Sequence, residues 1–296
     1  MPFLGEFAGL LTALCWSGSS MVFAAAASRV GSVQVNLSRL MIAAVLLCAV
    51  VFLFGLGGSL SESQWMYLAI SGIIGLAIGD SWLFRAYTEM GPRISMLIMS
   101  LSPAMTAFLG ALFLDEHLPL LGIAGMGVTL SGIAIVVLQR SESGSGGATV
   151  TTTGVLYALG GALGQAVNLL FVKAAFNEGP VNGFFATTVR IAAALVVLLP
   201  LMALSGRWAN PVREFRRDRK ALLLTAAGSV LGPFLGITFS LISVAHTSVA
   251  IASTLMSTVP ILMLPLVRFT GHERLSRRAI LGACIAVAGV ALLFLR

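Results

Sequence analysis

Long apolar segments separated by short polar connections follow one another along nearly the whole chain. A helix needs about 20 apolar residues to cross the hydrocarbon core of a bilayer, and about ten segments approach this length. They lie at 5–26, 33–55, 64–87, 93–114, 119–139, 152–174, 183–204, 220–243, 247–268 and 277–295. The pattern therefore predicts an all-α integral membrane protein with about ten transmembrane helices.

One apolar stretch of the sequence occurs twice, with the same spacing between a proline and a glutamate. Residues 102–116 read SPAMTAFLGALFLDE, and residues 258–273 read TVPILMLPLVRFTGHE. In both, a glutamate follows the proline by 13 residues, and a shift of 157 residues carries Pro103 onto Pro260. The stretch is the predicted fourth helix of each half with its exit, so its recurrence indicates that the fold itself is repeated.

Glycine pairs repeat with the same shift. It carries Gly75 and Gly79 onto Gly232 and Gly236, and both pairs have the small-xxx-small spacing of closely packed membrane helices. We interpret them as helix-packing positions.

The repeat predicts the organisation of the chain. We expect a first five-helix repeat at 1–140, a flexible linker at 141–151 containing SESGSGG, and a second five-helix repeat at 152–296. Because each half has an odd number of spans, the second half must enter the membrane in the opposite orientation. Inverted repeats are typical of secondary transporters, which bind substrate between the halves near the membrane midplane.

The chain resembles the drug/metabolite transporter superfamily, and more narrowly its ten-helix EamA-domain members. The resemblance rests on the two proline-to-glutamate stretches and on the glycine-marked helices that follow them, GIAGMGVTLSGIAIVVL and AILGACIAVAGVALLFL. It implies a single-chain carrier of small metabolites that works by alternating access. Small four-helix multidrug members carry a membrane-embedded glutamate in their first helix, where this chain has Cys15 and, in the second half, Gly164. Their glutamate-based proton exchange therefore does not carry over.

Composition supports a membrane protein and narrows the chemistry. Hydrophobic residues make up 58% of the chain and charged residues 10%, with a mean hydropathy of +0.99, whereas soluble domains carry about 25% charged residues. The net charge of +7 comes from short connections without interleaved aromatic residues, so we expect no nucleic-acid partner. The three cysteines lie in apolar segments without metal-ligand spacing, and no phosphate-binding glycine loop is present.

A membrane-embedded enzyme is disfavoured for the same reasons. Catalysis would need paired acids, a metal cluster or a nucleophile beside a base. The chain has three histidines, none at ligand spacing, and one acid well inside a predicted span. We therefore expect no enzyme activity, no metal and no cofactor. The expected partners are membrane lipid, a small-molecule substrate, protons as candidate coupling ions, and at most a second copy of the chain.

Basic residues give conflicting evidence on orientation. Thirteen follow odd-numbered spans, which makes that face cytoplasmic and both termini external, whereas the family resemblance favours cytoplasmic termini. In either orientation we expect a multi-pass protein of a bacterial-type plasma membrane. The thirteen are Arg29, Arg93, Arg140, Arg207, Arg213, Arg216, Arg217, Arg219, Lys220, Arg268, Arg274, Arg277 and Arg278.

Two arginines inside predicted spans are candidate cavity residues. Arg39 and Arg190 lie about seven residues into matched helices, roughly 10 Å along the axis. Asn36 precedes Arg39 by three residues, and Thr187 precedes Arg190 by three, so each polar pair shares a helix face. Matched polar faces favour a shared cavity; the alternative is that both arginines extend to the lipid headgroups.

Asp80 is the acid well inside a predicted span. Asp80, Phe84 and Tyr87 fall on one helix face, and the repeat carries Asp80 onto Ile237, so the feature is asymmetric. A buried carboxylate must find a partner or take up a proton. Asp80 is thus our candidate for coupling or for binding a substrate amine, with Tyr87 beside it. The alternative is a structural ion pair with Arg85 or with an arginine of another helix.

Three further residues are candidate substrate contacts. Trp16 and Gln165 occupy matched positions in the first helices of the two halves, and Asn168 lies one turn beyond Gln165. Trp16 is equally compatible with ordinary packing.

The repeated prolines and glutamates have structural and functional interpretations. Pro103 and Pro260 are candidate helix breaks that line the site, or else simple kinks. Glu116 and Glu273 are expected to cap the helix that follows each, with a gate-closing ion pair as the alternative.

The residues and the resemblance together predict a secondary transporter. We expect export of small metabolites such as amino acids or related compounds. The alternative is a lipid flippase or scramblase on the same fold, in which the polar faces of Arg39 and Arg190 meet phosphate groups.

Overall fold

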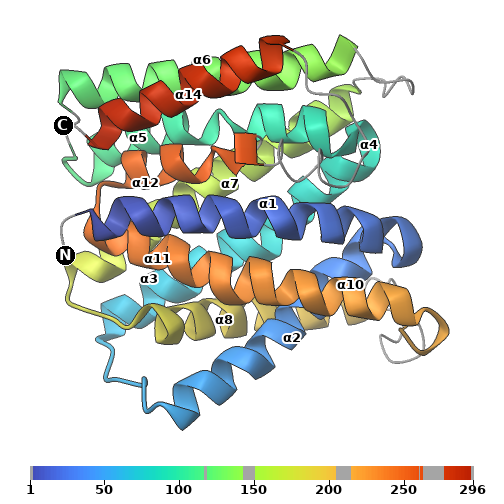
Figure 1. Ribbon diagram of the computed structural model, residues 1–296. Helices are drawn as coiled ribbons and strands as arrows, with labels where there is room; N and C mark the ends of the chain where they lie inside the picture. The colour runs from blue at the N-terminus through green and yellow to red at the C-terminus, as the bar shows by residue number, and fades with distance from the viewer. Residues whose placement is uncertain are drawn as a thin grey trace.

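The computed structural model describes residues 3–116, 119–142, 151–204, 215–259, 261–262 and 277–294. Regular structure in these residues is helical throughout (Figure 1). The first half contains α1 (Leu4–Val30), α2 (Ser32–Leu53), α3 (Glu62–Gly72), η1 (Ile73–Gly79), α4 (Asp80–Met99), α5 (Ser102–Phe113) and α6 (Leu120–Glu142). The second half contains α7 (Thr152–Asn177), α8 (Gly183–Leu204), α10 (Arg219–Ser229), η2 (Val230–Gly236), α11 (Ile237–His246), α12 (Val249–Met256) and α14 (Arg277–Phe294).

Six described helices are long and apolar enough to cross a membrane, and they occupy matching places in the two halves. They are Leu4–Val30, Ser32–Leu53, Glu62–Met90, Thr152–Asn177, Gly183–Leu204 and Arg219–His246, the first three spans of each half. Shorter apolar helices follow in the fourth and fifth places of the first half and in the fifth place of the second half. The prediction of an all-α membrane fold in two repeats is therefore confirmed. Most of the predicted linker, Pro260 and Glu273 lie outside the described residues.

The helix boundary between the predicted third and fourth spans differs from expectation. α4 continues to Met99, and the chain turns at Ser100 and Leu101 before α5 begins. Pro103 lies in the first turn of α5, where a missing N–H leaves no intrahelical hydrogen bond unmade. The shift of 157 residues carries the turn onto Ser257 and Thr258, where α12 has also just ended. The fourth helix is thus broken at matched positions in both halves.

Each half also contains a seven-residue π-helical segment, which the sequence pattern did not predict. η1 and η2 are related by the same shift of 157 residues, and each ends with a hydrogen bond to a carbonyl five residues back. These bonds run from Asp80 N–H to Gly75 O and from Ile237 N–H to Gly232 O. The repeated glycines therefore lie in the π-helical segments, immediately before the residues that begin α4 and α11.

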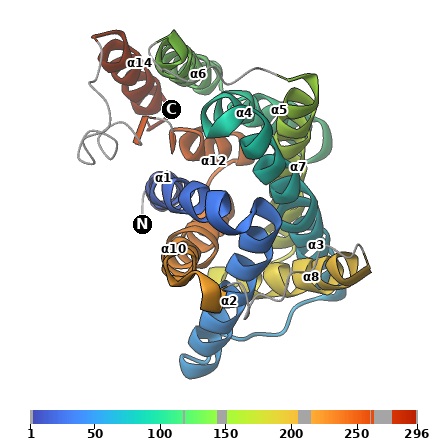
Figure 2. The same ribbon diagram turned by 90° about the vertical axis from the view of Figure 1, so that its right-hand side faces the viewer.

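The halves pack across one another. α7 contacts α3, η1, α4 and α5, while α1 contacts α10, η2, α11 and α12. Each repeat thus places its first helix against the third and fourth helices of the other repeat (Figures 1 and 2). The glycines of η1 and η2 permit this contact, because a Cβ on Gly75 would lie 2.8 Å from Asn168 Cγ and one on Gly236 2.6 Å from the Trp16 ring.

The fifth helices, α6 and α14, form a pair at the edge of the bundle (Figure 2). Their contact depends on small residues, since a Cβ on Gly132 would lie 2.6 Å from the carbonyl oxygen of Gly282. Close backbone approach of this kind supplies the packing energy between helices in lipid.

We predict that Gly132→Ala destabilises the protein by about 1–3 kcal/mol, because the added methyl group overpacks the contact between α6 and α14. Gly127→Ala is the matched control on the same helix, since a Cβ there meets nothing within 4 Å. Thermal unfolding of the purified variants in detergent measures the difference. Equal unfolding temperatures for the two variants would contradict the packing described.

A central cavity between the repeats

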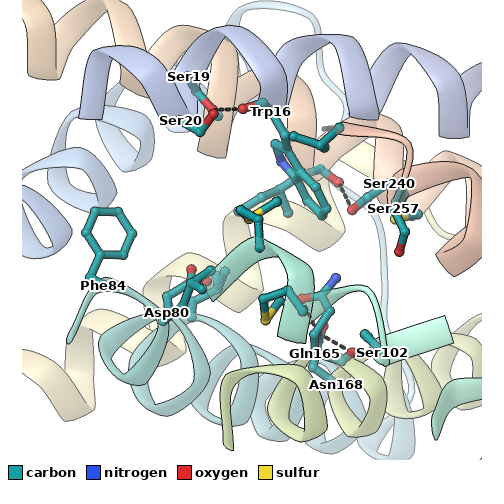
Figure 3. Close-up of a pocket in the computed structure, with 18 of the residues that line it drawn as sticks. Trp16, Ser19, Ser20, Asp80, Phe84, Ser102, Gln165, Asn168, Ser240 and Ser257 are labelled. Carbon is teal, nitrogen blue, oxygen red and sulfur yellow. Dashed lines mark hydrogen bonds between the residues drawn. The ribbon is translucent and has the colours of Figure 1, made fainter. Parts of the chain in front are cut away.

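A cavity of about 140 Å³ lies between the two repeats (Figure 3). Side chains from both halves line it, with Trp16 of α1 facing Asp80 of α4 and Gln165 and Asn168 of α7 across the space. Of the eight side chains named from the sequence as substrate contacts, seven line this cavity: Trp16, Arg39, Asp80, Tyr87, Gln165, Asn168 and Arg190.

Arg39 and Asp80 form an ion pair in the cavity wall. An Nη of Arg39 donates to an Asp80 carboxylate oxygen, and the Arg39 Nε donates to Asn36 Oδ1 at 2.9 Å. The guanidinium also lies over the Phe84 and Phe23 rings, 5.0 and 5.6 Å from their centroids. Arg39 is only 6% exposed, so it faces the protein interior and not the headgroups.

The partner of Asp80 is thus an arginine of another helix. Arg85 instead pairs with Glu89 at 3.1 Å, and its side chain is 57% exposed. Such an exposed pair contributes little to stability.

Arg190 is buried without a carboxylate beside it in the described part of the chain. It is 2% exposed, and its Nε donates to Ser71 Oγ at 2.9 Å while an Nη donates to Asn168 Oδ1 at 2.6 Å. Asn168 is held in turn by its amide, which donates to the carbonyl and side-chain oxygens of Gln165. Thr187 does not join this network, because its hydroxyl donates to the carbonyl of Gly183 at 2.7 Å. The two arginines therefore have unlike surroundings.

Asn36 lies outside the central cavity. It accepts the hydrogen bond from Arg39 and donates to Ser81 Oγ at 3.1 Å, so it stands behind Arg39 in the wall. It lines a second groove of about 300 Å³, on the side of α2 and α4, whose lining also includes Val33, Trp82 and Met202. We call this the lateral groove. The expectation that Asn36 shares the cavity with Arg39 is thus not met, because the arginine side chain reaches past it.

Serine side chains form much of the cavity wall and were not singled out in the sequence. Ser102 is 2% exposed, and its hydroxyl has no hydrogen-bond partner in the described structure. The sequence did contain a signal for two of these serines, because the shift of 157 residues carries Ser100 onto Ser257 and both line the cavity. The lining serines are Ser19, Ser20, Ser100, Ser102, Ser240, Ser253 and Ser257.

The bundle is sealed at the end where α1 begins. Glu116 accepts the N–H of Val249, the first residue of α12, at 2.9 Å, and lies 3.8 Å from Lys173 Nζ. Lys173 also donates to the carbonyls of Val244 and Thr247 at 3.1 and 3.0 Å. Burial raises the pKa of the Glu116 carboxyl above its ordinary value. Glu116 therefore caps α12, a helix of the other repeat. The sequence had instead led us to expect a cap on the helix that follows Glu116.

At the opposite end, the described residues include an ion pair that is more exposed. Arg29, in the last turn of α1, pairs with Asp218 at 2.6 Å in an exposed position, and this hydrogen bond lowers the pKa of Asp218. The lining of the cavity extends toward this end through Phe84, Tyr87 and Met96, and no described residue of α1 before Trp16 contributes to it. The cavity is thus separated from the sealed end by packed helix.

Long apolar helices in two repeats around a cavity with charged and hydroxyl side chains in a largely apolar wall are the architecture of a multi-pass membrane carrier. The EamA-like transporter family matches the chain twice, over residues 3–138 and 152–295, and the chain belongs to this family.

Several relatives are similar to the chain. A probable terminal-alkyne amino-acid exporter of Streptantibioticus cattleyicolor is 24% identical, over 96% of this chain and 91% of its own. The uncharacterized transporter YyaM of Bacillus subtilis is 29% identical over about half of each protein, 53% of this chain and 51% of its own. A crystal structure with a TM-score of 0.75 and 20% identity covers 98% of this chain and 97% of its own, which establishes the likeness in fold.

We predict that Glu116→Ala opens the sealed end, because it removes the carboxylate that joins α5, α7 and α12. A cysteine introduced at Ser253, which lines the cavity on α12, should then react at least about tenfold faster with a membrane-impermeant thiol reagent added at that end. A tenfold change corresponds to a shift of roughly 1.4 kcal/mol in the equilibrium between closed and open states. Asp218→Ala, which breaks the exposed pair at the other end, serves as the control. Unchanged labelling in Glu116→Ala would show that the contact is no seal. The background lacks the native Cys15, Cys48 and Cys284.

Proposed function

We propose that the protein is a secondary transporter that exports small metabolites, such as amino acids or related compounds, across a bacterial-type plasma membrane. The observation that carries this proposal is the buried cavity between the repeats, lined by polar groups of both and closed at one end by contacts between them. A carrier that alternates between two accessible states needs a site of this kind. The similarity to an amino-acid exporter over nearly the full chain supports the substrate class.

Charge and cavity together support the proposed direction of transport, if the count of basic connections is followed over the opposite orientation that the family resemblance favours. Counting basic connections makes the end of the bundle where α1 finishes cytoplasmic. The sealed end then faces outward, and the side lined by Tyr87 and Met96 faces the cytoplasm. Substrate would enter from the cytoplasm, which suits export.

Asp80 is the residue we propose for coupling to protons. It is the carboxylate among the described lining residues, and it neutralises Arg39. Protonation of Asp80 would remove the negative charge that a cationic group of the substrate, such as the amine of an amino acid, can bind, so a proton and this group would compete for the carboxylate. Exchange of the two across the membrane is a direct consequence.

The lateral groove favours a second candidate, movement of lipid. It lies beside the cavity, separated from Arg39 by the hydrogen bond between Asn36 and Ser81, and Phe84 lines both spaces. An amphipathic molecule in this groove would meet Arg39 only if that bond opened. Fluorescent-lipid scrambling by the same proteoliposomes tests this candidate.

We predict that Asp80→Asn abolishes the stimulation of transport by a pH gradient, because the amide cannot exchange a proton. Counterflow of labelled amino acids in proteoliposomes, with and without the gradient, measures the effect. Glu89→Gln, which removes an acid from the exposed pair with Arg85, is the matched control and should behave as the parent. Gradient-driven accumulation by folded Asp80→Asn at the parental rate would refute the coupling role.

A further inference from the structure

The two repeats treat their buried arginines differently. Arg39 is paired with Asp80 at the start of α4, whereas the repeat places Ile237 at the corresponding position, the start of α11. Ile237 lines the same cavity, and α11 packs on α8, which carries Arg190. The second repeat therefore keeps the arginine and the backbone but lacks the carboxylate.

The charge of the cavity is unbalanced as a result. Among the described lining residues, Arg39 and Arg190 are cationic and Asp80 is anionic, so one positive charge is in excess. The direct hydrogen-bond partners of Arg190, Ser71 and Asn168, are neutral, and Asp80, the carboxylate that acts on its charge, is already paired with Arg39. A buried charge without a counterion costs several kcal/mol, so a ligand that supplies one negative charge is favoured.

The break before α5 adds a second group suited to an anion. α5 is a 12-residue helix whose first turn starts at the cavity, and its positive end favours negative charge there. Ser102, at the first position, contributes a buried hydroxyl that has no partner in the described structure. α5 packs on α7, from which Gln165 and Asn168 line the same cavity (Figure 3). This side of the cavity thus offers an anion the unpartnered hydroxyl of Ser102 and the positive end of α5.

We propose that Arg190 and Ser102 bind the singly charged carboxylate group of an organic acid in the cavity, which in an amino acid is the α-carboxylate. The carboxylate would take the role beside Arg190 that Asp80 has beside Arg39. A carboxylate fits better than a phosphate monoester, whose charge of about −1.5 to −2 exceeds the single positive charge in excess. The proposal rests on the cavity being the transport site.

The remaining walls suit the apolar part of such an acid. Trp16, Phe23 and Phe84 line the cavity from α1 and α4. Aromatic side chains offer large apolar contact to a substrate body while the donors hold its charged end.

Matched ligand pairs test the proposal with purified protein. Acetate, isovalerate and phenylacetate are compared with acetamide, isovaleramide and phenylacetamide, by thermal shift and by competition in the counterflow assay. We expect at least one acid to bind about tenfold or more tightly than its amide, the effect of one or two charge-assisted hydrogen bonds. Equal binding of acid and amide, or tighter binding of inorganic phosphate or phenethylamine, would overturn the proposal.

A charge introduced at Ile237 gives a sharper test. Ile237→Asp supplies Arg190 with an internal counterion and should weaken acid binding at least about tenfold. Ile237→Asn introduces a side chain of nearly the same size and shape as aspartate but without the charge, and should weaken acid binding much less. Equal loss in the two variants would mean that size and not charge is responsible, and the proposal would fall.

Two more variants address the donors themselves. Ser102→Ala should keep its fold, because the hydroxyl has no partner to lose, and should weaken acid binding about tenfold. Arg190→Gln should remove the preference for acid over amide, while Arg85→Gln, in the exposed pair, should keep it. Unchanged acid preference in both cavity variants would contradict the assignment.

The failure of this inference differs from failure of the proposed function. If amides or amines are carried as well as acids, the protein is a transporter whose site does not select a carboxylate. If folded protein moves none of the solutes, the transport proposal fails and the carboxylate site fails with it.

Discussion

The burial of two guanidinium groups in the interior of a membrane protein is the constraint on which the rest of the structure depends. A charge inside a span is costly and therefore faces other polar groups, not lipid. Arg39 obtains Asp80 and two aromatic faces, and Arg190 obtains Ser71 and Asn168. Because Ser71 belongs to the first repeat and Arg190 to the second, satisfying the arginine also holds the repeats together. The polar interface between the halves follows from these needs.

The π-helical segments explain how two repeats with one backbone reach different chemistry. η1 and η2 have the same length and the same closing hydrogen bond, so they bring Asp80 and Ile237 to matched positions beside the cavity. Glycines in both segments allow the first helix of the opposite repeat to approach closely. The backbone thus imposes the pseudo-symmetry, while single side chains break it. This separation lets one site carry an ion pair on one side and, on the other, a cation whose direct hydrogen-bond partners are neutral.

Features of the structure that a local sequence pattern encodes could be predicted, whereas features set by tertiary packing could not. Periodic hydrophobicity and the shift of 157 residues were sufficient for the repeated helical fold, and the polar and charged positions within the spans for seven of the cavity-lining side chains. They were insufficient for the π-helical segments, since residue periodicity barely distinguishes one added residue per turn. Asn36 was misplaced because spacing gives a helix face but not how far Arg39 reaches beyond it. Glu116 was assigned to the wrong helix, because its partner, Val249, is 133 residues distant along the chain.

The two ends of the bundle differ in a way that bears on transport. At the end where α1 begins, Glu116 and Lys173 bind backbone groups of α11 and α12 in a partly buried setting, so separating them would expose several hydrogen-bonding groups at once. Among the described residues at the other end, Arg29 and Asp218 form an exposed pair, which water replaces at little cost. For the sealed end to open, energy must come from the site itself. The excess positive charge beside Arg190 is a suitable source, because neutralising it changes the electrostatic energy of the interface that both repeats share.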